Sequence, residues 1–147
     1  MAEIKAEKAI MVNAPADKIW RVMLEVASWP RWFPALKGAG MVSGQPLAKD
    51  SVLWFKLALV GPALPMRVRV TESVPAKRVA WAGGMLGVAG MHSFDFEAQG
   101  DKTRVTSREV LQGPMVGLMK LLFNDDDLGR LHQDWIQALK AEAERSK

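Results

Sequence analysis

Trp29-Pro30-Arg31-Trp32-Phe33-Pro34, together with the preceding Ile19-Trp20-Arg21-Val22-Met23, is the part of the sequence that decides the fold. These two segments hold three of the six tryptophans of the 147-residue chain. Pro30 and Pro34 remove backbone donors and disfavour the helical conformation in the residues before them. The sequence therefore predicts an amphipathic helix that starts near Pro15 and ends at a short aromatic turn, the tryptophan-proline corner (residues 29–34).

Strands are predicted on both sides of this helix. Residues 3–12 alternate weakly, with Ile4, Ile10 and Val12 set against charged neighbours, as is typical of a half-exposed strand. After the corner, six runs bounded by glycine, proline or both predict six more strands, at residues 36–43, 51–60, 64–74, 78–83, 91–98 and 102–111.

The C-terminal segment is predicted to be helical. Apolar residues recur at helical spacing from Leu118 to Ala143. Asn124 and Asp127 have the spacing of a helix cap, so the segment forms either one long helix or a short helix followed by a long one. Residues 1–147 are thus predicted to form a single α+β domain, in which a long helix covers one face of a seven-stranded antiparallel sheet.

Composition narrows the function. The net charge is +4 and the isoelectric point is near 9.6, but the basic residues are scattered among acidic ones, so we expect no nucleic-acid partner. No apolar run is long enough for a stable membrane insertion, and the N-terminal residues are charged. The sequence predicts a cytoplasmic protein. Because the chain has no cysteine, disulfide scaffolds and thiolate chemistry are excluded.

Five segments together resemble the SRPBCC superfamily, whose helix-grip fold is shared by START lipid-transfer domains, polyketide cyclases and plant pollen allergens. They are Ala14-Pro15 with Ile19-Trp20, the tryptophan-proline corner, residues 74–81 (Val-Pro-Ala-Lys-Arg-Val-Ala-Trp), residues 102–106 (Lys-Thr-Arg-Val-Thr) and residues 139–144 (Leu-Lys-Ala-Glu-Ala-Glu). The resemblance implies a curved sheet wrapped around the C-terminal helix, two short helices between the first two strands, and a deep apolar cavity that holds a hydrophobic small molecule.

Strand alternation predicts which side chains face such a cavity, because successive side chains point to opposite faces of a sheet. The predicted ligand-binding residues on strands are Leu53, Phe55, Leu57, Val68, Val70, Trp81, Phe94 and Phe96. The C-terminal helix adds Leu128 and Trp135 from its apolar stripe.

The turn at Gly100-Asp101 gives the most specific prediction about chemistry. A glycine in the first position of a two-residue loop suits a type II′ hairpin. That register places His92 opposite Glu109 on the inner face. The two could act as an acid/base pair or orient a polar ligand head, and the alternative is a structural pair at the cavity rim.

His132 lies on the flank of the helical stripe, where it is either a packed histidine or a ligand contact. No metal site is expected, because the chain has two histidines, no cysteine and no metal-ligand spacing. Likewise no cofactor is expected, and residues 125–127 are interpreted as a solvated helix start.

Three loop segments are unusually apolar: residues 60–65, 83–90 and 115–119. They form either a flexible lip for ligand entry or a packing surface, such as a homodimer interface.

The sequence thus predicts binding or transport of a lipid-, polyketide- or quinone-like molecule. One alternative is a cyclase/dehydrase-type enzyme that uses His92 and Glu109. Another is a co-chaperone or ribosome-associated module, which would have a core filled by side chains.

Overall fold

The structure is a computed structural model, and it describes residues 2–59 and 61–145. The chain begins with β1 (Glu3–Val12), α1 (Ala16–Leu24), a 3-10 turn (Val26–Ser28) and α2 (Trp29–Trp32). Six strands follow, namely β2 (Gly38–Ser43), β3 (Val52–Leu57), β4 (Leu64–Val74), β5 (Arg78–Met85), β6 (Val88–Gln99) and β7 (Lys102–Gln112). The chain continues with α3 (Val116–Met119) and α4 (Asp125–Arg145). Val60, the predicted end of the third strand, lies outside the described residues.

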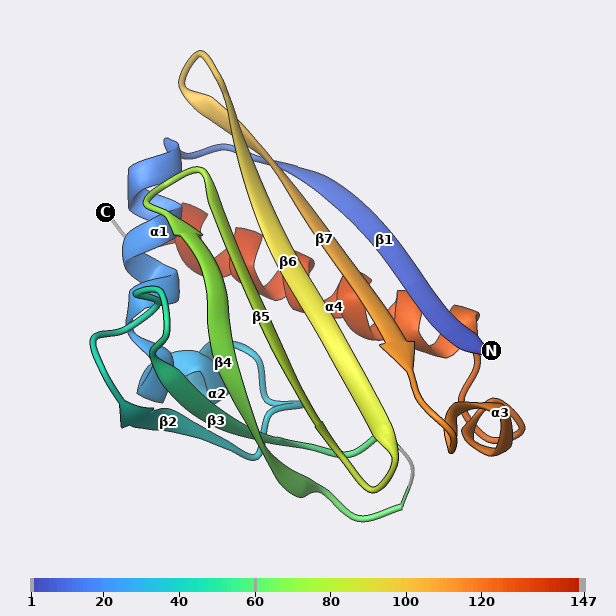
Figure 1. The fold of residues 1–147 in the computed structure, drawn as a ribbon. Coiled ribbons are helices and arrows are strands. Elements are labelled where there is room, and N and C mark those ends of the chain that lie inside the picture. Colours follow the sequence, from blue (N-terminus) through green and yellow to red (C-terminus); the bar gives the residue numbers. More distant parts are fainter. Residues whose placement is uncertain (1, 60, 146–147) are drawn as a thin grey trace.

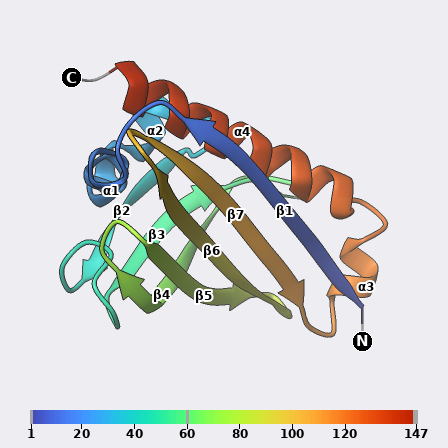
Figure 2. The ribbon, with the colours of Figure 1, turned by 90° about the horizontal axis from the view of Figure 1, so that it is seen from above.

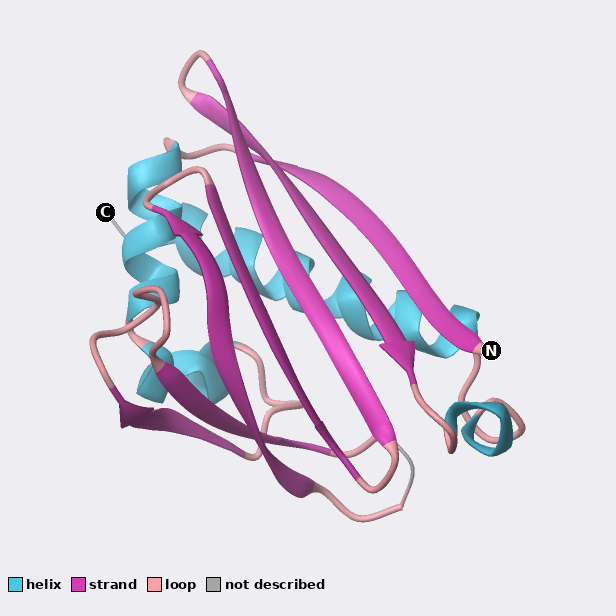
Figure 3. Cartoon of the chain, in the orientation of Figure 1, coloured by secondary structure: helices cyan, strands magenta, loops and turns pink. Residues whose placement is uncertain are grey.

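The seven strands form one antiparallel sheet in the order β1-β7-β6-β5-β4-β3-β2. Figures 1 and 3 show this sheet curving around α4, with α1 and α2 at one end of the helix and α3 at the other. Seen from above in Figure 2, α4 runs along the concave side of the sheet, next to β1. The predicted helix-grip architecture is therefore confirmed.

The tryptophan-proline corner ties the first helices to α4. The indole N–H of Trp29 donates to the Met23 carbonyl at 3.0 Å, and Arg31 donates to the buried carboxylate of Glu142 at 2.9 Å. Burial acts to raise the pKa of Glu142, but hydrogen bonds from Arg145 and Arg31 outweigh it, so this pKa lies below its ordinary value. The corner thus braces both ends of the chain.

The C-terminal segment forms two helices, the second alternative that the sequence left open. The backbone N–H of Asn124 donates to the Asp127 carboxylate at 2.8 Å, and the Asp127 N–H donates back to the Asn124 side chain at 3.0 Å. This reciprocal cap satisfies donors that a helix start leaves without partners. It starts a new helix of 21 residues, α4, after the short α3.

The hairpin register follows its turn. Gly100 has a φ of +68°, which glycine adopts without steric cost. His92 lies opposite Glu109, as predicted. In the neighbouring hairpin Val70 lies opposite Trp81. Leu53, Phe55, Leu57, Val68 and Val70 are all buried, as strand alternation predicts.

The glycine-rich segment 83–90 differs from the prediction, because it is mostly strand and not loop. Gly83 pairs with Gly90 in the ladder of β5 and β6, and only Leu86 and Gly87 form the turn. Glycine is required at position 83 because a Cβ there would lie 2.4 Å from the Arg67 carbonyl oxygen. The glycines therefore serve a close approach of strands, which their sequence alone did not distinguish from a loop.

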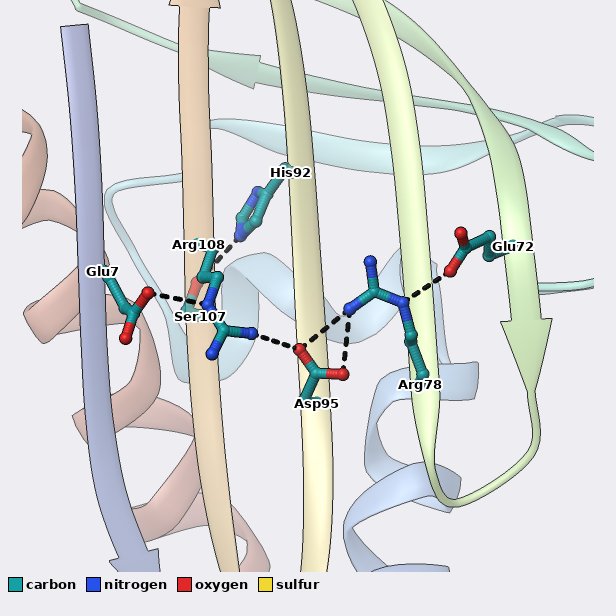
Figure 4. Close-up of polar contacts among 7 residues, drawn as sticks. All are labelled: Glu7, Glu72, Arg78, His92, Asp95, Ser107 and Arg108. Carbon is teal, nitrogen blue, oxygen red and sulfur yellow. Dashed lines mark hydrogen bonds and ion pairs between the residues drawn. The ribbon is translucent and has the colours of Figure 1, made fainter.

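Charged side chains cross the outer face of the sheet in a row that we call the outer ladder. Figure 4 shows its alternating members, Glu7, Arg108, Asp95, Arg78 and Glu72, on five successive strands. Arg108 and Arg78 both reach the central Asp95 at 2.9 Å. Hydrogen bonds to Glu72 and Asp95 raise the pKa of Arg78. The ladder links β4, β5, β6, β7 and β1 on the solvent side.

Candidate functional site

A cavity of about 370 Å³ lies between the sheet and α4, at the end of the molecule near α3. Its volume is within the range of small-molecule sites. Most of its wall is apolar, contributed by β3, β4, β5, β6, β7, α3 and α4. The lining residues include Phe55, Trp81, Gly90, His92, Glu109 and Trp135.

Seven of the predicted ligand-binding residues line this cavity: Phe55, Leu57, Val68, Trp81, His92, Glu109 and Trp135. The others are buried but do not line the cavity: Leu53, Val70, Phe94, Phe96, Leu128 and His132. The reason is that alternation assigns a face, whereas the cavity occupies only one end of that face. Strand parity alone therefore could not separate cavity wall from filled core.

The predicted apolar loops surround the outer end of the cavity. Leu86, in the turn between β5 and β6, and Leu118 and Leu122, near α3, line the cavity and remain 60–78% exposed. By contrast, Trp81 and Trp135 are each 2% exposed at its other end. The cavity therefore runs inward from an exposed apolar rim to a buried aromatic floor.

The floor is an aromatic cluster centred on Trp135. Trp135 packs within 5.2–6.4 Å, between ring centroids, of Phe55, Trp81 and His92. Its indole N–H is fully enclosed and has no hydrogen-bond partner among the described residues. An enclosed donor without a partner costs about 1–3 kcal/mol.

Four polar side chains form one hydrogen-bonded series beside this floor, which we call the inner network. His92 Nε2 and Ser107 Oγ lie 2.9 Å apart, and Ser107 Oγ lies 2.6 Å from Nδ1 of His132. The other nitrogen of His132, Nε2, lies 2.7 Å from Oε1 of Glu109. Figure 4 shows His92 and Ser107 reaching each other from β6 and β7. The members in order are His92, Ser107, His132 and Glu109.

The network is buried in its middle and open at its ends. Ser107 and His132 are 0% exposed, and neither lines the cavity, whereas His92 and Glu109 both line it. Burial, with a smaller contribution from nearby His132, holds the pKa of His92 well below its ordinary value. His92 is therefore neutral at physiological pH.

The predicted direct pair of His92 and Glu109 takes a different form. The two residues are cross-strand neighbours as expected, but their polar atoms are joined through Ser107 and His132. The helical residue His132 inserts between them from α4. Strand alternation places Ser107 on the same face as Glu109, but it does not identify Ser107 as the centre of a network. One sequence signal could have indicated this network: Ser107 and Glu109 are two inward-facing polar residues, two positions apart on one strand.

The inner network contains a serine, a histidine and a glutamate in hydrogen-bonded order, yet it is not a hydrolase triad. A nucleophilic serine must touch the substrate. Ser107 is fully buried and does not line the cavity.

Nitrogen and oxygen atoms of His92, His132 and Glu109 lie within 4.8 Å of one another. They are held in a continuous hydrogen-bonded series through Ser107, so a cation would have to displace existing bonds. The expectation of no metal stays a prediction.

The chain matches known proteins over nearly its whole length. A family model described as "Polyketide cyclase / dehydrase and lipid transport" matches residues 3–144. No curated protein matches the sequence.

Several solved structures share the fold at low sequence identity. A START superfamily protein from Mycobacterium smegmatis is 18% identical with a TM-score of 0.77, covering 96% of this chain and 97% of that one. The Zhui aromatase/cyclase from a Streptomyces species is 17% identical with a TM-score of 0.74, covering 98% and 95%. Major latex-like protein 151 from Panax ginseng is 13% identical with a TM-score of 0.72, covering 96% and 97%. At these identities the likeness is one of fold.

Proposed function

Because the chain belongs to the family of polyketide cyclases, dehydrases and lipid-transport proteins, we propose that it binds a hydrophobic, aromatic small molecule with one polar group. The observation that carries this proposal is the cavity of about 370 Å³, with an apolar wall and polar atoms at its inner end. Aromatic side chains at the floor favour a planar ligand.

The polar atoms at the floor favour a carbonyl group on that ligand. His92 lines the cavity, and Nδ1 of its ring makes no hydrogen bond among the described residues. A carbonyl oxygen accepts hydrogen bonds and costs little to bury when it receives one. A plain hydrocarbon would form no hydrogen bond with the His92 ring, so we expect it to bind more weakly.

The inner network favours a second candidate, an enzyme of the cyclase/dehydrase kind. Glu109 and His92 both line the cavity and could exchange protons with a bound molecule. The interaction-module alternative required a core filled by side chains, and the cavity argues against that premise.

Isothermal titration calorimetry with two matched ligands tests the binding function. We use 2-tetralone, a bicyclic aromatic ketone, and tetralin, the same skeleton without the carbonyl. We expect 2-tetralone to bind at least several-fold more tightly, which corresponds to about 1 kcal/mol for one hydrogen bond. Absence of binding by either ligand would contradict an aromatic-ligand cavity.

Two tryptophan substitutions provide the control. Leu131 lines the cavity from α4, so Leu131→Trp should fill it and weaken 2-tetralone binding by about tenfold or more. Leu121 is 78% exposed and does not line the cavity, so Leu121→Trp should leave the affinity unchanged. Equal affinities in both variants would place the bound ligand elsewhere.

A further inference from the structure

The inner network begins and ends at the same cavity. Glu109 uses Oε1 to reach His132, and its other oxygen, Oε2, lies 3.3 Å from where a Cβ on Gly90 would be. Gly90 is itself part of the cavity wall. Oε2 makes no hydrogen bond among the described residues, so one end of the network is a carboxylate oxygen without a protein partner beside the cavity.

His92 supplies the other end. Its Nε2 is engaged with Ser107, while its Nδ1 makes no hydrogen bond in the described part of the chain. Within that part, Trp135 Nε1 is the one fully enclosed side-chain polar atom without a partner, so Nδ1 of His92 is not fully enclosed. Because His92 lines the cavity, we assign Nδ1 to the cavity side of the ring.

The hydrogen bonds between these ends can run in either direction. With Glu109 ionised, Nε2–H of His132 donates to Oε1 of Glu109, and the Ser107 hydroxyl donates to Nδ1 of His132. His92 then donates from Nε2–H to Ser107 Oγ, so Nδ1 of His92 carries no proton. With a proton on Oε1 of Glu109, every bond reverses, and Nδ1 of His92 carries the proton. The two forms differ by one proton, and no histidine is charged in either.

We propose that the inner network is a two-ended proton relay that enolises a carbonyl compound bound in the cavity, with Glu109 and His92 as the groups that contact it. This inference rests on the proposed function, because it needs a hydrophobic ketone in the cavity. Ser107 and His132 act as positioning residues that carry the proton between the two ends.

The step starts from the form with a proton on Oε1 of Glu109 and on Nδ1 of His92, and it is balanced within the network and the ligand. Oε2 of Glu109 takes a proton from the carbon next to the carbonyl, and the electrons of that C–H bond form the carbon–carbon double bond of the enol. The carbonyl oxygen takes the proton from Nδ1 of His92. Three transfers inside the network then follow. Ser107 supplies a proton to Nε2 of His92, and Nδ1 of His132 supplies a proton to Ser107. Oε1 of Glu109 supplies a proton to Nε2 of His132.

No member of the network becomes charged in this step, which matters because charge separation in a buried site of low dielectric constant is costly. On β1 the residue opposite Ser107 is Lys8, which is exposed and whose side chain lies against Gly129 of α4. On β1 the residue opposite Glu109 is Ala6.

The relay is tested first without a ligand, by 15N NMR of the two histidine rings. As the pH falls and the network gains one proton, both rings should change together from the Nε2–H to the Nδ1–H tautomer. In Ser107→Ala the two changes should no longer coincide, while Ser107→Thr, which keeps the hydroxyl, should restore them. A change in one ring only, or formation of a charged ring at this step, would overturn the relay.

Hydrogen exchange of 2-tetralone in D2O then tests the reaction, since NMR follows loss of the proton between its ring and its carbonyl. We expect acceleration of about 10²-fold over buffer, the lower range for positioned acid–base groups. Glu109→Gln should abolish it, and Ser107→Ala should abolish it while 2-tetralone still binds by calorimetry. Ser107→Thr should retain it.

These measurements separate the two proposals. If 2-tetralone does not bind, the proposed function fails for aromatic ketones. The 15N NMR measurement of the histidine tautomers still tests the relay in that case. If Ser107→Ala binds 2-tetralone and exchanges it as fast as the parent chain does, Glu109 acts alone and the relay is wrong. If Ser107→Thr also loses exchange, the tautomers of that variant decide between a lost relay and an altered fold.

Discussion

His92 is the residue whose environment departs furthest from water. It is buried between Trp81, Phe94 and His132, with ring centroids 4.5–5.0 Å away. Burial is the main cause of its lowered pKa, and the proximity of His132 adds to it. Because the folded chain keeps this ring neutral, the ring couples protonation to stability.

We predict that stability falls as the pH drops below about 6.5, the ordinary histidine value. Below this pH the unfolded chain gains a proton at His92, whereas His92 stays neutral in the folded chain. The stabilisation of the folded state that depends on a neutral His92 is therefore present above pH 6.5 and is lost below it. The slope for one such group approaches about 1.4 kcal/mol per pH unit. Urea unfolding followed by circular dichroism between pH 7.5 and 5 measures it.

His92→Gln is the matched variant, because glutamine can bond to Ser107 but does not titrate. Its unfolding free energy should vary less over this pH range, while His132 and Glu109 remain present in both proteins. Parallel curves for the two proteins would mean that His92 does not carry the effect.

Strand pairs and turns explain why part of the site could be predicted from sequence. The Gly100-Asp101 turn fixes the register of β6 against β7 locally, so His92 and Glu109 were correctly placed opposite each other. His132 could not be placed in the same way. Its distance from Ser107 depends on how α4 is rotated against the sheet, and no local turn determines that rotation.

The outer ladder provides a prediction for the sheet as an element. Asp95 accepts hydrogen bonds from both Arg78 and Arg108, so Asp95→Asn removes the charge that separates two arginines. Because these side chains are partly exposed, we expect a loss of only about 1 kcal/mol in unfolding free energy, measured by urea unfolding. Added salt should shrink the difference, since screening weakens both the attraction and the repulsion.

Asp101→Asn is the control for the ladder. Asp101 lies exposed in the turn after β6 and makes no ion pair in the described part of the chain. This variant should change the stability by less than about 0.5 kcal/mol. An equal loss in both variants would show that the ladder contributes nothing beyond general surface charge.

At the scale of the whole molecule, the fold divides into a filled half and a hollow half. The tryptophan-proline corner packs Trp29 against Trp81 and Trp135, and this packing fills the end near α1 and α2. Towards α3 the same sheet encloses the cavity. Among the described residues, no helix combines the length and the hydrophobicity required to cross a bilayer. The sequence identified the fold through the corner, but it did not indicate at which end the hollow would lie.

A ligand that binds only the folded molecule must stabilise all of it. At a free 2-tetralone concentration of one hundred times its Kd, we expect about 2.7 kcal/mol of added unfolding free energy. For a chain of this size that corresponds to a rise in Tm of roughly 5–10 °C, measured by circular dichroism on heating. Leu131→Trp should show almost no rise, and a rise equal to that of the parent chain would contradict binding in the cavity.

The aromatic floor also gives the molecule a built-in optical label. The chain has six tryptophans and no tyrosine, so its ultraviolet emission comes almost entirely from indole rings. Trp29, Trp81 and Trp135 have ring centroids 5.8–6.4 Å apart, close enough for excitation to pass among them. Two of the three line the cavity. A bound ligand whose absorption overlaps indole emission would therefore quench the fluorescence of the whole cluster. The unlabelled protein would then report ligand binding directly in a screen of compounds.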